Sequence, residues 1–313
     1  MVYIGIDLGA TNIAVGVVSE DGKILYQKEA PTKAERQWQP VVRDMAAISM
    51  SALSEAGYDL DDLKAVGMGV PGICVDGAIP FCTNLGWHDV PIERAFREYI
   101  DKPLFVDNDA TVAGLAEAVS GVSASVSNSV FLTLGTGVGG GIILNKKPYS
   151  GSHGVGSELG HMTILADGEM CTCGKRGCLE RYASATAMIR MGIEAMREHP
   201  QSELFTLTEG DPSRMTAKIV IDAAKAGDSA AREIFDIYIK YLSLGINTVI
   251  SFIDPEMIVL GGGVSRAGAF LLDAVRNELP KYIFFRTMPY ASVELARLGN
   301  EAGIIGAAML GRD

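Results

Sequence analysis

Several features are scarce in this chain, and each absence excludes a class of protein. Only 5 of 313 residues are cysteines, too few for the disulfide framework of a secreted scaffold. Acidic residues outnumber basic ones, and the net charge of −11 argues against nucleic acid or an anionic membrane as partner. No apolar run approaches the roughly 18 residues of a membrane span, and the N-terminus lacks a signal peptide's basic leader. These absences predict a cytoplasmic protein.

The chain is long and apolar enough to build two lobes, each with its own core. Its length is 313 residues, and 48% of them are hydrophobic. We expect a small lobe at residues 1–114, completed by a C-terminal helix at 300–313. Residues 115–299 then form a large lobe.

Residues 154–180 carry the most specific pattern. Cys171, Cys173 and Cys178 lie close together, and His161 lies ten residues ahead of the first of them. Three thiolates and one imidazole are a tetrahedral ligand set for zinc. The alternatives are buried thiols beside an unrelated histidine, or a strained disulfide between Cys171 and Cys173. Because the protein fills all four positions, we expect a structural zinc with no open position for water.

Two glutamates accompany the predicted metal ligands. Glu158 lies three residues before His161, and Glu180 lies two residues after Cys178. A folded metal loop would fix both carboxylates, and a zinc-bound imidazole keeps a second ring nitrogen for hydrogen bonding. Such groups can bind sugar hydroxyls, unless both glutamates are simply solvated surface charges. Loss of a zinc ligand should lower sugar affinity and stability together. It should lower nucleotide affinity less, because the turns predicted to bind phosphate, at residues 7–12 and 135–137, lie elsewhere in the sequence.

This spacing resembles a known family. Glu158-x-Gly-His161, followed by Cys-x-Cys-Gly-x-x-Gly-Cys-x-Glu180, is similar to the signature of the ROK family (repressors, open reading frames and sugar kinases). The resemblance extends along nearly the whole chain and is greatest to the bacterial glucokinases of that family. It implies that His161 ligates zinc and also faces the sugar, and that both glutamates bind sugar hydroxyls.

A glycine-containing hairpin turn near the N-terminus suits a phosphate. Three antiparallel strands are predicted at residues 2–8, 13–19 and 23–30. Glycine in the first turn lets the backbone approach a phosphate, threonine offers a hydroxyl, and aspartate can hold hydrated Mg²⁺. An ordinary hairpin turn favours the same residue types, so the turn alone is a weak signal. The candidate cofactor-binding residues of this turn are Asp7, Gly9, Ala10, Thr11 and Asn12.

The same arrangement recurs farther along the chain, where an apolar run at 130–134 leads into Gly135, Thr136 and Gly137. Two such units predict an internally duplicated fold that binds a nucleotide, although the spacing is neither a Rossmann fingerprint nor a Walker loop. The pattern resembles the actin-like, ribonuclease-H-like ATPase fold, an α/β fold of two lobes with a nucleotide and sugar cleft between them. A third turn, at Gly262 and Gly263, is either a tight packing turn or, as the family implies, the lining of the nucleoside.

A candidate base follows a short strand predicted at residues 104–106. Phosphoryl transfer to an alcohol needs a base within hydrogen-bond reach of the hydroxyl. From the residues alone, Asp109 is either that base or a helix N-cap, and Asn108 or Asp107 could serve as the cap instead. The family resemblance assigns Asp109 as the base and Asn108 as a sugar ligand. An Asn-Leu-x-Trp match implies that Asn84 is another sugar ligand.

Further elements are predicted along the chain, and among them only the loop at 83–89 carries a candidate ligand, Asn84. They are a helix at 40–56, a strand at 65–70, a loop at 83–89, one helix at 183–198, a polar loop at 199–214, helices at 216–226 and 229–252, a strand at 257–260, a strand at 293–298 and a helix at 301–310.

Together these features predict an ATP-dependent hexokinase that phosphorylates glucose and uses ATP, Mg²⁺ and a structural zinc. Where many family members have Gly-Gly-Thr-Lys, this chain has Ala10 and Asn12, so we expect altered nucleotide affinity with function retained. The alternatives are kinases for fructose, N-acetylglucosamine, N-acetylmannosamine or allose, and a sugar sensor without catalysis. The family's repressors carry a helix-turn-helix segment ahead of the first strand, which here starts at residue 2, so we expect no nucleic-acid binding. The family also leads us to expect a homodimer or higher homo-oligomer.

Overall fold

The structure, a computed structural model, describes residues 1–312 of the chain. These residues form two compact units. Unit 1 comprises Met1–Phe131, Gly141–Ser157 and residues 296–312, and unit 2 comprises Leu132–Gly140 and Glu158–Leu295. Each unit is described by itself below. The lobe boundary that the sequence predicts after residue 114 stays a prediction.

Unit 1 contains a five-stranded sheet with the order β3-β2-β1-β4-β8. β1 pairs antiparallel with β2 and parallel with β4, and β4 pairs parallel with β8. β1 is buried at nearly every position because it is a central strand, whereas the edge strand β3 alternates. The strands are β1 (Val2–Leu8), β2 (Asn12–Val18), β3 (Ile24–Pro31), β4 (Leu63–Val70) and β8 (Leu104–Asn108).

Helices cover this sheet, and one of them comes from the C-terminus. α10 packs so closely on β1 and β4 that only glycine fits beneath it. A Cβ atom at Gly5 would lie 1.9 Å from the carbonyl oxygen of Ile304, and one at Gly67 would lie 1.7 Å from that of Ala307. The end of the chain therefore completes unit 1. The helices of this unit are α1 (Trp38–Glu55), α2 (Ile92–Arg97), α3 (Asp109–Val119) and α10 (Ala302–Met309).

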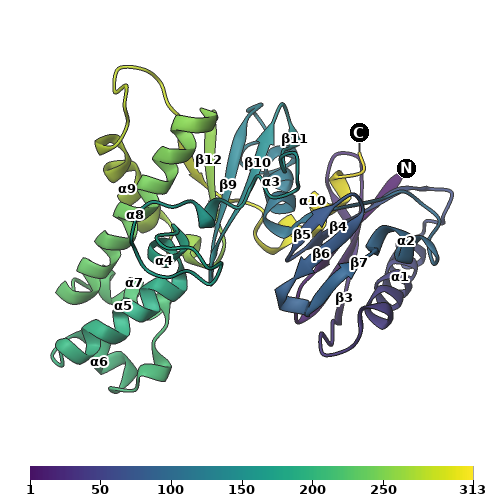
Figure 1. The fold of residues 1–313 in the computed structure, drawn as a ribbon. Helices are drawn as coiled ribbons and strands as arrows, with labels where there is room; N and C mark the ends of the chain where they lie inside the picture. The colour runs from purple at the N-terminus through teal and green to yellow at the C-terminus, as the bar shows by residue number, and fades with distance from the viewer. Residues whose placement is uncertain (313) are drawn as a thin grey trace. The chain divides into compact units, whose positions relative to one another are not determined.

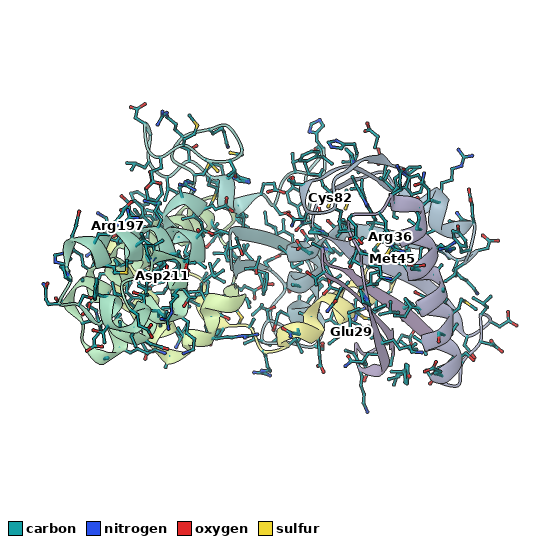
Figure 2. The ribbon with its side chains drawn as sticks, turned by 90° about the horizontal axis from the view of Figure 1, so that it is seen from below. Glu29, Arg36, Met45, Cys82, Arg197 and Asp211 are labelled. Carbon is teal, nitrogen blue, oxygen red and sulfur yellow. The ribbon has the colours of Figure 1, made fainter. Side chains whose placement is uncertain are left out.

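A smaller sheet of three strands, in the order β5-β6-β7, also belongs to unit 1. Its strands are β5 (Ile73–Val75), β6 (Ala78–Cys82) and β7 (Trp87–Val90). The sequence predicts a loop at 83–89, and this is wrong in part, because Trp87 pairs with Cys82 across a hairpin. Cys82 and Met45 belong to the core of this unit (Figure 2).

The second large sheet repeats the order of the first, as β11-β10-β9-β12-β13 (Figure 1). An antiparallel strand lies at one edge and a parallel pair, β12 and β13, at the other. This repetition bears out the internally duplicated fold that the two glycine turns predict. The strands are β9 (Ser129–Leu134), β10 (Val138–Leu144), β11 (Lys147–Pro148), β12 (Met257–Gly261) and β13 (Ser292–Leu295).

Unit 2 also contains six helices among its described residues, and side-chain caps mark the beginning of four of them. Ser184, Ser202, Thr216 and Asp228 each accept a hydrogen bond from a backbone N–H in the first turn of the following helix. The helices are α4 (Glu180–Ala183), α5 (Ala185–Glu198), α6 (Glu203–Thr208), α7 (Ala217–Ala226), α8 (Ser229–Ile253) and α9 (Ala269–Glu278).

Two sequence-based predictions in unit 2 are wrong. The single helix predicted at 183–198 is broken, because Ser184 is extended, with φ −114° and ψ 165°, and caps α5. The polar loop predicted at 199–214 contains α6. That short helix depends on a tertiary contact, since the Asp228 carboxylate accepts hydrogen bonds from both the Ser202 hydroxyl and the Glu203 N–H. Ser202 is a local cap, but the additional acceptor at Asp228 leaves no signal near the helix.

Among residues 1–312, no helix is both long enough and apolar enough to cross a lipid bilayer.

Candidate active site and metal centre

The predicted metal ligands come together in unit 2. One ligand atom from each of His161, Cys171, Cys173 and Cys178 lies within 4.8 Å of the others. The Nδ1 atom of His161 is 3.6 Å from the Cys171 Sγ atom, and the Cys173 and Cys178 Sγ atoms are also 3.6 Å apart. A disulfide needs sulfurs about 2 Å apart, so the thiols are free.

These distances fit a tetrahedral zinc ion. With Zn–S bonds of about 2.3 Å and Zn–N bonds of about 2.0–2.1 Å, the edges of the tetrahedron are roughly 3.8 Å between sulfurs and roughly 3.6 Å between sulfur and nitrogen. Burial raises the pKa of the Cys178 thiol to about 12, and the neighbouring thiols of Cys173 and Cys171 add to this. A bound cation would offset that cost by stabilising the thiolates.

Glycines shape the loop that carries the cysteines. Gly174 and Gly177 have positive φ values of 87° and 76°, in the region that other residues rarely adopt. A Cβ atom at Gly177 would lie 1.6 Å from the carbonyl oxygen of Leu165. The Cys171 N–H donates to the Lys175 carbonyl oxygen at 2.8 Å, which closes the turn between the first and last thiols.

The same loop orients the carboxylate of Glu158. His161 ends the short 3₁₀ helix Leu159–His161, and with Nδ1 facing Cys171 its other ring nitrogen, Nε2, lies 4.0 Å from a carboxylate oxygen of Glu158. The imidazole can therefore ligate a metal with one nitrogen and hydrogen-bond with the other. Glu158 is exposed, so its oxygens are accessible to a small ligand.

Glu180 takes a position that its place in the sequence does not reveal. Its Oε2 atom accepts a hydrogen bond from the Val138 N–H at 3.1 Å. A Cβ atom at Gly137 would lie 2.1 Å from the same oxygen. The carboxylate thus rests on the backbone of the second glycine turn, and the expectation that this turn lies away from the zinc loop is wrong.

That second turn is short. Residues 138–141 belong to β10, so the glycines after Gly137 lie in a strand and the turn itself is Gly135-Thr136-Gly137. The beginning of α5 holds the turn from the other side. The Ala185 N–H donates to the Gly135 carbonyl oxygen at 2.8 Å, and the Thr186 hydroxyl donates to that of Thr136 at 2.7 Å. The sequence analysis missed Thr186, although a Ser-Ala-Thr cap after Glu180 was a usable signal.

The first glycine turn, in unit 1, has a comparable geometry. The Gly9 N–H donates to the Asn12 carbonyl oxygen at 2.9 Å, and the Thr32 hydroxyl donates to the Gly9 carbonyl oxygen at 2.7 Å. Ala10 and Thr11 are exposed at its tip. Asp7 ends up against α10, since a Cβ at Gly303 would lie 2.3 Å from its carboxylate, and burial raises the pKa of Asp7. Burial disfavours the charged form of this carboxyl group, and a bound cation would stabilise that charged form.

The third turn follows β12 in unit 2. Gly262 has a φ of 81°, and a Cβ atom there would lie 2.6 Å from the Leu134 carbonyl oxygen, so the turn must be glycine to fit beside β9. Gly263 is exposed with no atom near the position of a Cβ. The open side of this turn can therefore accept a flat ligand against the backbone.

The proposed base and its neighbours lie where β8 meets α3 in unit 1. Asn108 is the N-cap, because its Oδ1 atom accepts from the Ala110 N–H at 2.9 Å while its Nδ2 donates to the Gly72 carbonyl oxygen at 3.2 Å. Asp109 is therefore not the cap but the first helical residue, and its carboxylate is exposed. Asn84, in the 3₁₀ turn Thr83–Leu85, is exposed as well.

Asp107 proves to be a structural neighbour of this site. Its Oδ1 atom accepts from the Asn108 N–H at 2.7 Å, and the Ser150 hydroxyl lies 3.1 Å and 3.3 Å from its two oxygens. Burial raises the pKa of Asp107. Seven residues after Ser150, the buried hydroxyl of Ser157 lies 3.2 Å from that of Thr111 on α3. Two polar contacts thus tie the segment before Glu158 to the site of Asp109, one at the end of β8 and one on α3.

The comparisons with known proteins agree with these features. The family model described as "ROK family" matches residues 3–313. The chain belongs to the ROK family. Glucokinases from Halalkalibacterium halodurans and Thermotoga maritima are each 37% identical to it, and the matches cover 98% of this chain and 94% and 96% of theirs. A ROK family glucokinase from Streptomyces griseus, crystallised in complex with glucose and AMPPNP, is 33% identical, with a TM-score of 0.82 over 100% of this chain and 99% of that one.

Membership of the ROK family confirms the actin-like ATPase fold that the sequence predicts. The roles of the individual site residues stay predictions. Within this ROK protein the groups predicted to bind sugar or nucleotide fall into two sets. Unit 1 contains Asp7, Gly9, Ala10, Thr11, Asn12, Asn84, Asn108 and Asp109, and unit 2 contains Gly135, Thr136, Gly137, Glu158, His161, Glu180, Gly262 and Gly263.

Proposed function

We propose that this protein transfers the terminal phosphoryl group of ATP to the primary hydroxyl of glucose. The observation that carries the proposal is full-length similarity to proteins named glucokinases, at identities up to 37%. The Streptomyces griseus relative was crystallised with glucose and an ATP analogue, so one chain of this fold holds both ligands.

Asp109 is the proposed base. It follows the capped end of β8, where the hydrogen bonds of Asn108 fix the backbone, and its carboxylate is accessible. The carboxylate would take the proton of the glucose 6-hydroxyl as that oxygen bonds to the terminal phosphorus and the bond from this phosphorus to the bridging oxygen of ADP breaks. Positioning and charge stabilisation supply most of the catalysis in such transfers.

The remaining groups bind and orient the ligands. Asn84, Asn108, Glu158, His161 and Glu180 would hydrogen-bond the sugar hydroxyls, and the three glycine turns would offer backbone N–H groups to the nucleotide. Asp7 would hold a hydrated Mg²⁺, which neutralises phosphate charge when bound. A zinc ion would be held by His161 and the three cysteines Cys171, Cys173 and Cys178. Its role would be structural, because these four residues leave no coordination position open. Because ATP and glucose meet in the cytoplasm, we place the activity there. The family leads us to expect a homo-oligomer.

The direct test is a coupled assay of ATP consumption over a panel of hexoses. Glucose should give the highest kcat/KM among glucose, mannose, fructose, allose, N-acetylglucosamine and N-acetylmannosamine. The ratio of kcat/KM values should strongly favour glucose over a sugar that lacks one of its hydroxyls, since a protein group that the bound sugar covers then loses its hydrogen-bond partner. A higher kcat/KM for fructose or an N-acetyl sugar would refute the choice of glucose. No turnover of any sugar, with glucose still bound, would instead support a non-catalytic sensor.

A further inference from the structure

The segment 158–180, which carries Glu158, His161 and Glu180, contacts both backbone polar groups of Val138, the residue that follows the second glycine turn in unit 2. The N–H of Val138 donates to Glu180 Oε2 at 3.1 Å, and the carbonyl oxygen of Val138 lies against Gly160, where a Cβ atom would approach it to 1.9 Å. Gly160 lies between the two residues, Glu158 and His161, that are proposed to bind the sugar. The turn that would contact phosphate is therefore held by the segments that would contact glucose.

We propose that Glu180 is a positioning residue for the glycine turn as well as a sugar ligand, and that it couples hexose binding to nucleotide binding. One of its oxygens is committed to the Val138 N–H, which leaves the other for a sugar hydroxyl. A sugar that orders this side chain also orders the turn, so each ligand should strengthen the binding of the other. The inference rests on the proposed function for the identity of the two ligands.

Space around the turn leaves Glu180 little choice of position. A Cβ atom at Gly137 would lie 2.1 Å from Glu180 Oε2, which means that the carboxylate occupies the room where any other residue would carry a side chain. The Thr186 hydroxyl and the Ala185 N–H hold the carbonyl oxygens of the turn from the α5 side. Glu180 thus accepts the hydrogen bond of the Val138 N–H, directly after a turn whose carbonyl oxygens at Gly135 and Thr136 already accept hydrogen bonds from α5.

The decisive experiment measures the binding of AMPPNP with Mg²⁺ in the absence of any sugar, by calorimetry. Glu180→Ala should weaken AMPPNP at least about fivefold, because the turn loses a hydrogen bond to a charged group. Glu180→Gln keeps an acceptor oxygen, so it should bind AMPPNP within about twofold of the wild type while its affinity for glucose falls. Glu158→Gln is the matched control. It removes charge from the other proposed sugar ligand and should leave AMPPNP binding unchanged.

A reciprocal variant tests the coupling from the other side. Gly137→Ala places a methyl group against Glu180, so glucose alone should bind more weakly, although Gly137 itself is not a proposed sugar ligand. In the wild type, saturating AMPPNP should tighten glucose binding by about fivefold or more, and Glu180→Ala should abolish that gain.

Two outcomes separate this inference from the proposed function. If AMPPNP affinity in Glu180→Ala equals that in Glu158→Gln, the inference is wrong, even when glucose is phosphorylated by the wild type. If another hexose proves the better substrate, the proposed function fails, but the sugar-free AMPPNP measurement still decides the role of Glu180. Thermal melting of Glu180→Gln and Glu180→Ala shows whether a loss of affinity reflects unfolding.

Discussion

The predicted zinc ligands allow a sharp test, because the chain offers two buried cysteines in different settings. Cys178 belongs to the ligand cluster and is 0% exposed, while Cys82, 1% exposed, lies in the core of unit 1 (Figure 2). We compare Cys178→Ser with Cys82→Ser as its control. The Cys82 thiol donates to the Pro71 carbonyl oxygen at 3.3 Å, a hydrogen bond that a serine hydroxyl can keep.

The expected effect follows from binding linkage. The ligand atoms already lie at distances that match the edges of a zinc tetrahedron, so little reorganisation opposes binding. A ligand present at about 1,000 times its Kd stabilises the folded state by about 4 kcal/mol. At roughly 2–4 °C per kcal/mol for a chain of this size, loss of the zinc lowers Tm by about 10 °C.

Elemental analysis and thermal melting provide the measurements. The wild type and Cys82→Ser should contain about one zinc per chain, and a strong chelator should lower their Tm. Cys178→Ser should contain little zinc, melt about 10 °C lower and show no further shift with chelator. A Cys178→Ser protein with one zinc and an unchanged Tm would refute the assignment.

Nucleotide affinity supplies a second readout for the same variant. Cys178 lies two residues before Glu180, which holds the Val138 N–H, and His161 follows Gly160, which packs on the Val138 carbonyl oxygen. Cys178→Ser should therefore weaken AMPPNP binding as well as glucose binding, whereas the sequence alone leads us to expect a smaller effect on the nucleotide. Unchanged AMPPNP binding in a folded, zinc-free variant would show that the loop does not support the turn.

Three further substitutions test the base, the fold and a buried carboxyl group. Asp109→Asn removes the proton acceptor and should lower kcat by about 100-fold or more while glucose still binds; near-normal kcat would show that another group is the base. Gly67→Ala forces a methyl group to 1.7 Å from the Ala307 carbonyl oxygen and should cost about 3 kcal/mol or more, whereas Gly69→Ala meets only a side chain at 3.3 Å and should cost less in urea unfolding. Equal losses would contradict the close packing of α10. Because burial raises the pKa of Asp107, its folded state binds a proton more tightly than the unfolded state, and the stability of the wild type relative to Asp107→Asn should fall as pH rises from about 4 through the raised pKa. A difference that stays flat or grows over that range would show that burial does not control this group.

The sequence determined much of this protein because several signals were local. The spacing of His161, Cys171, Cys173 and Cys178 predicted a cluster that the structure brings within 4.8 Å. The repeated strand, glycine turn and strand predicted a duplicated fold, which the matching strand orders bear out. The spaced motif also identified the ROK family, which the family model confirms. Each of these patterns is made of short sequence segments, so no tertiary contact was needed to detect it.

The tertiary structure decided what depends on residues far apart in the chain. Nothing near Glu180 in the sequence shows that its carboxylate rests on Val138, 42 residues earlier, and this contact joins the predicted metal loop to the second glycine turn, which the sequence placed apart. The Asp228 carboxylate accepts a hydrogen bond from the Glu203 N–H, 25 residues earlier, and this support for α6 is not visible in the polar composition that predicted a loop there. In the sequence, Gly67 is one small residue in an apolar strand. Only the packing of α10, some 240 residues later, shows that this position must be glycine. Spacing along the chain shows which groups can meet locally, but only folding brings distant backbone atoms within hydrogen-bond distance.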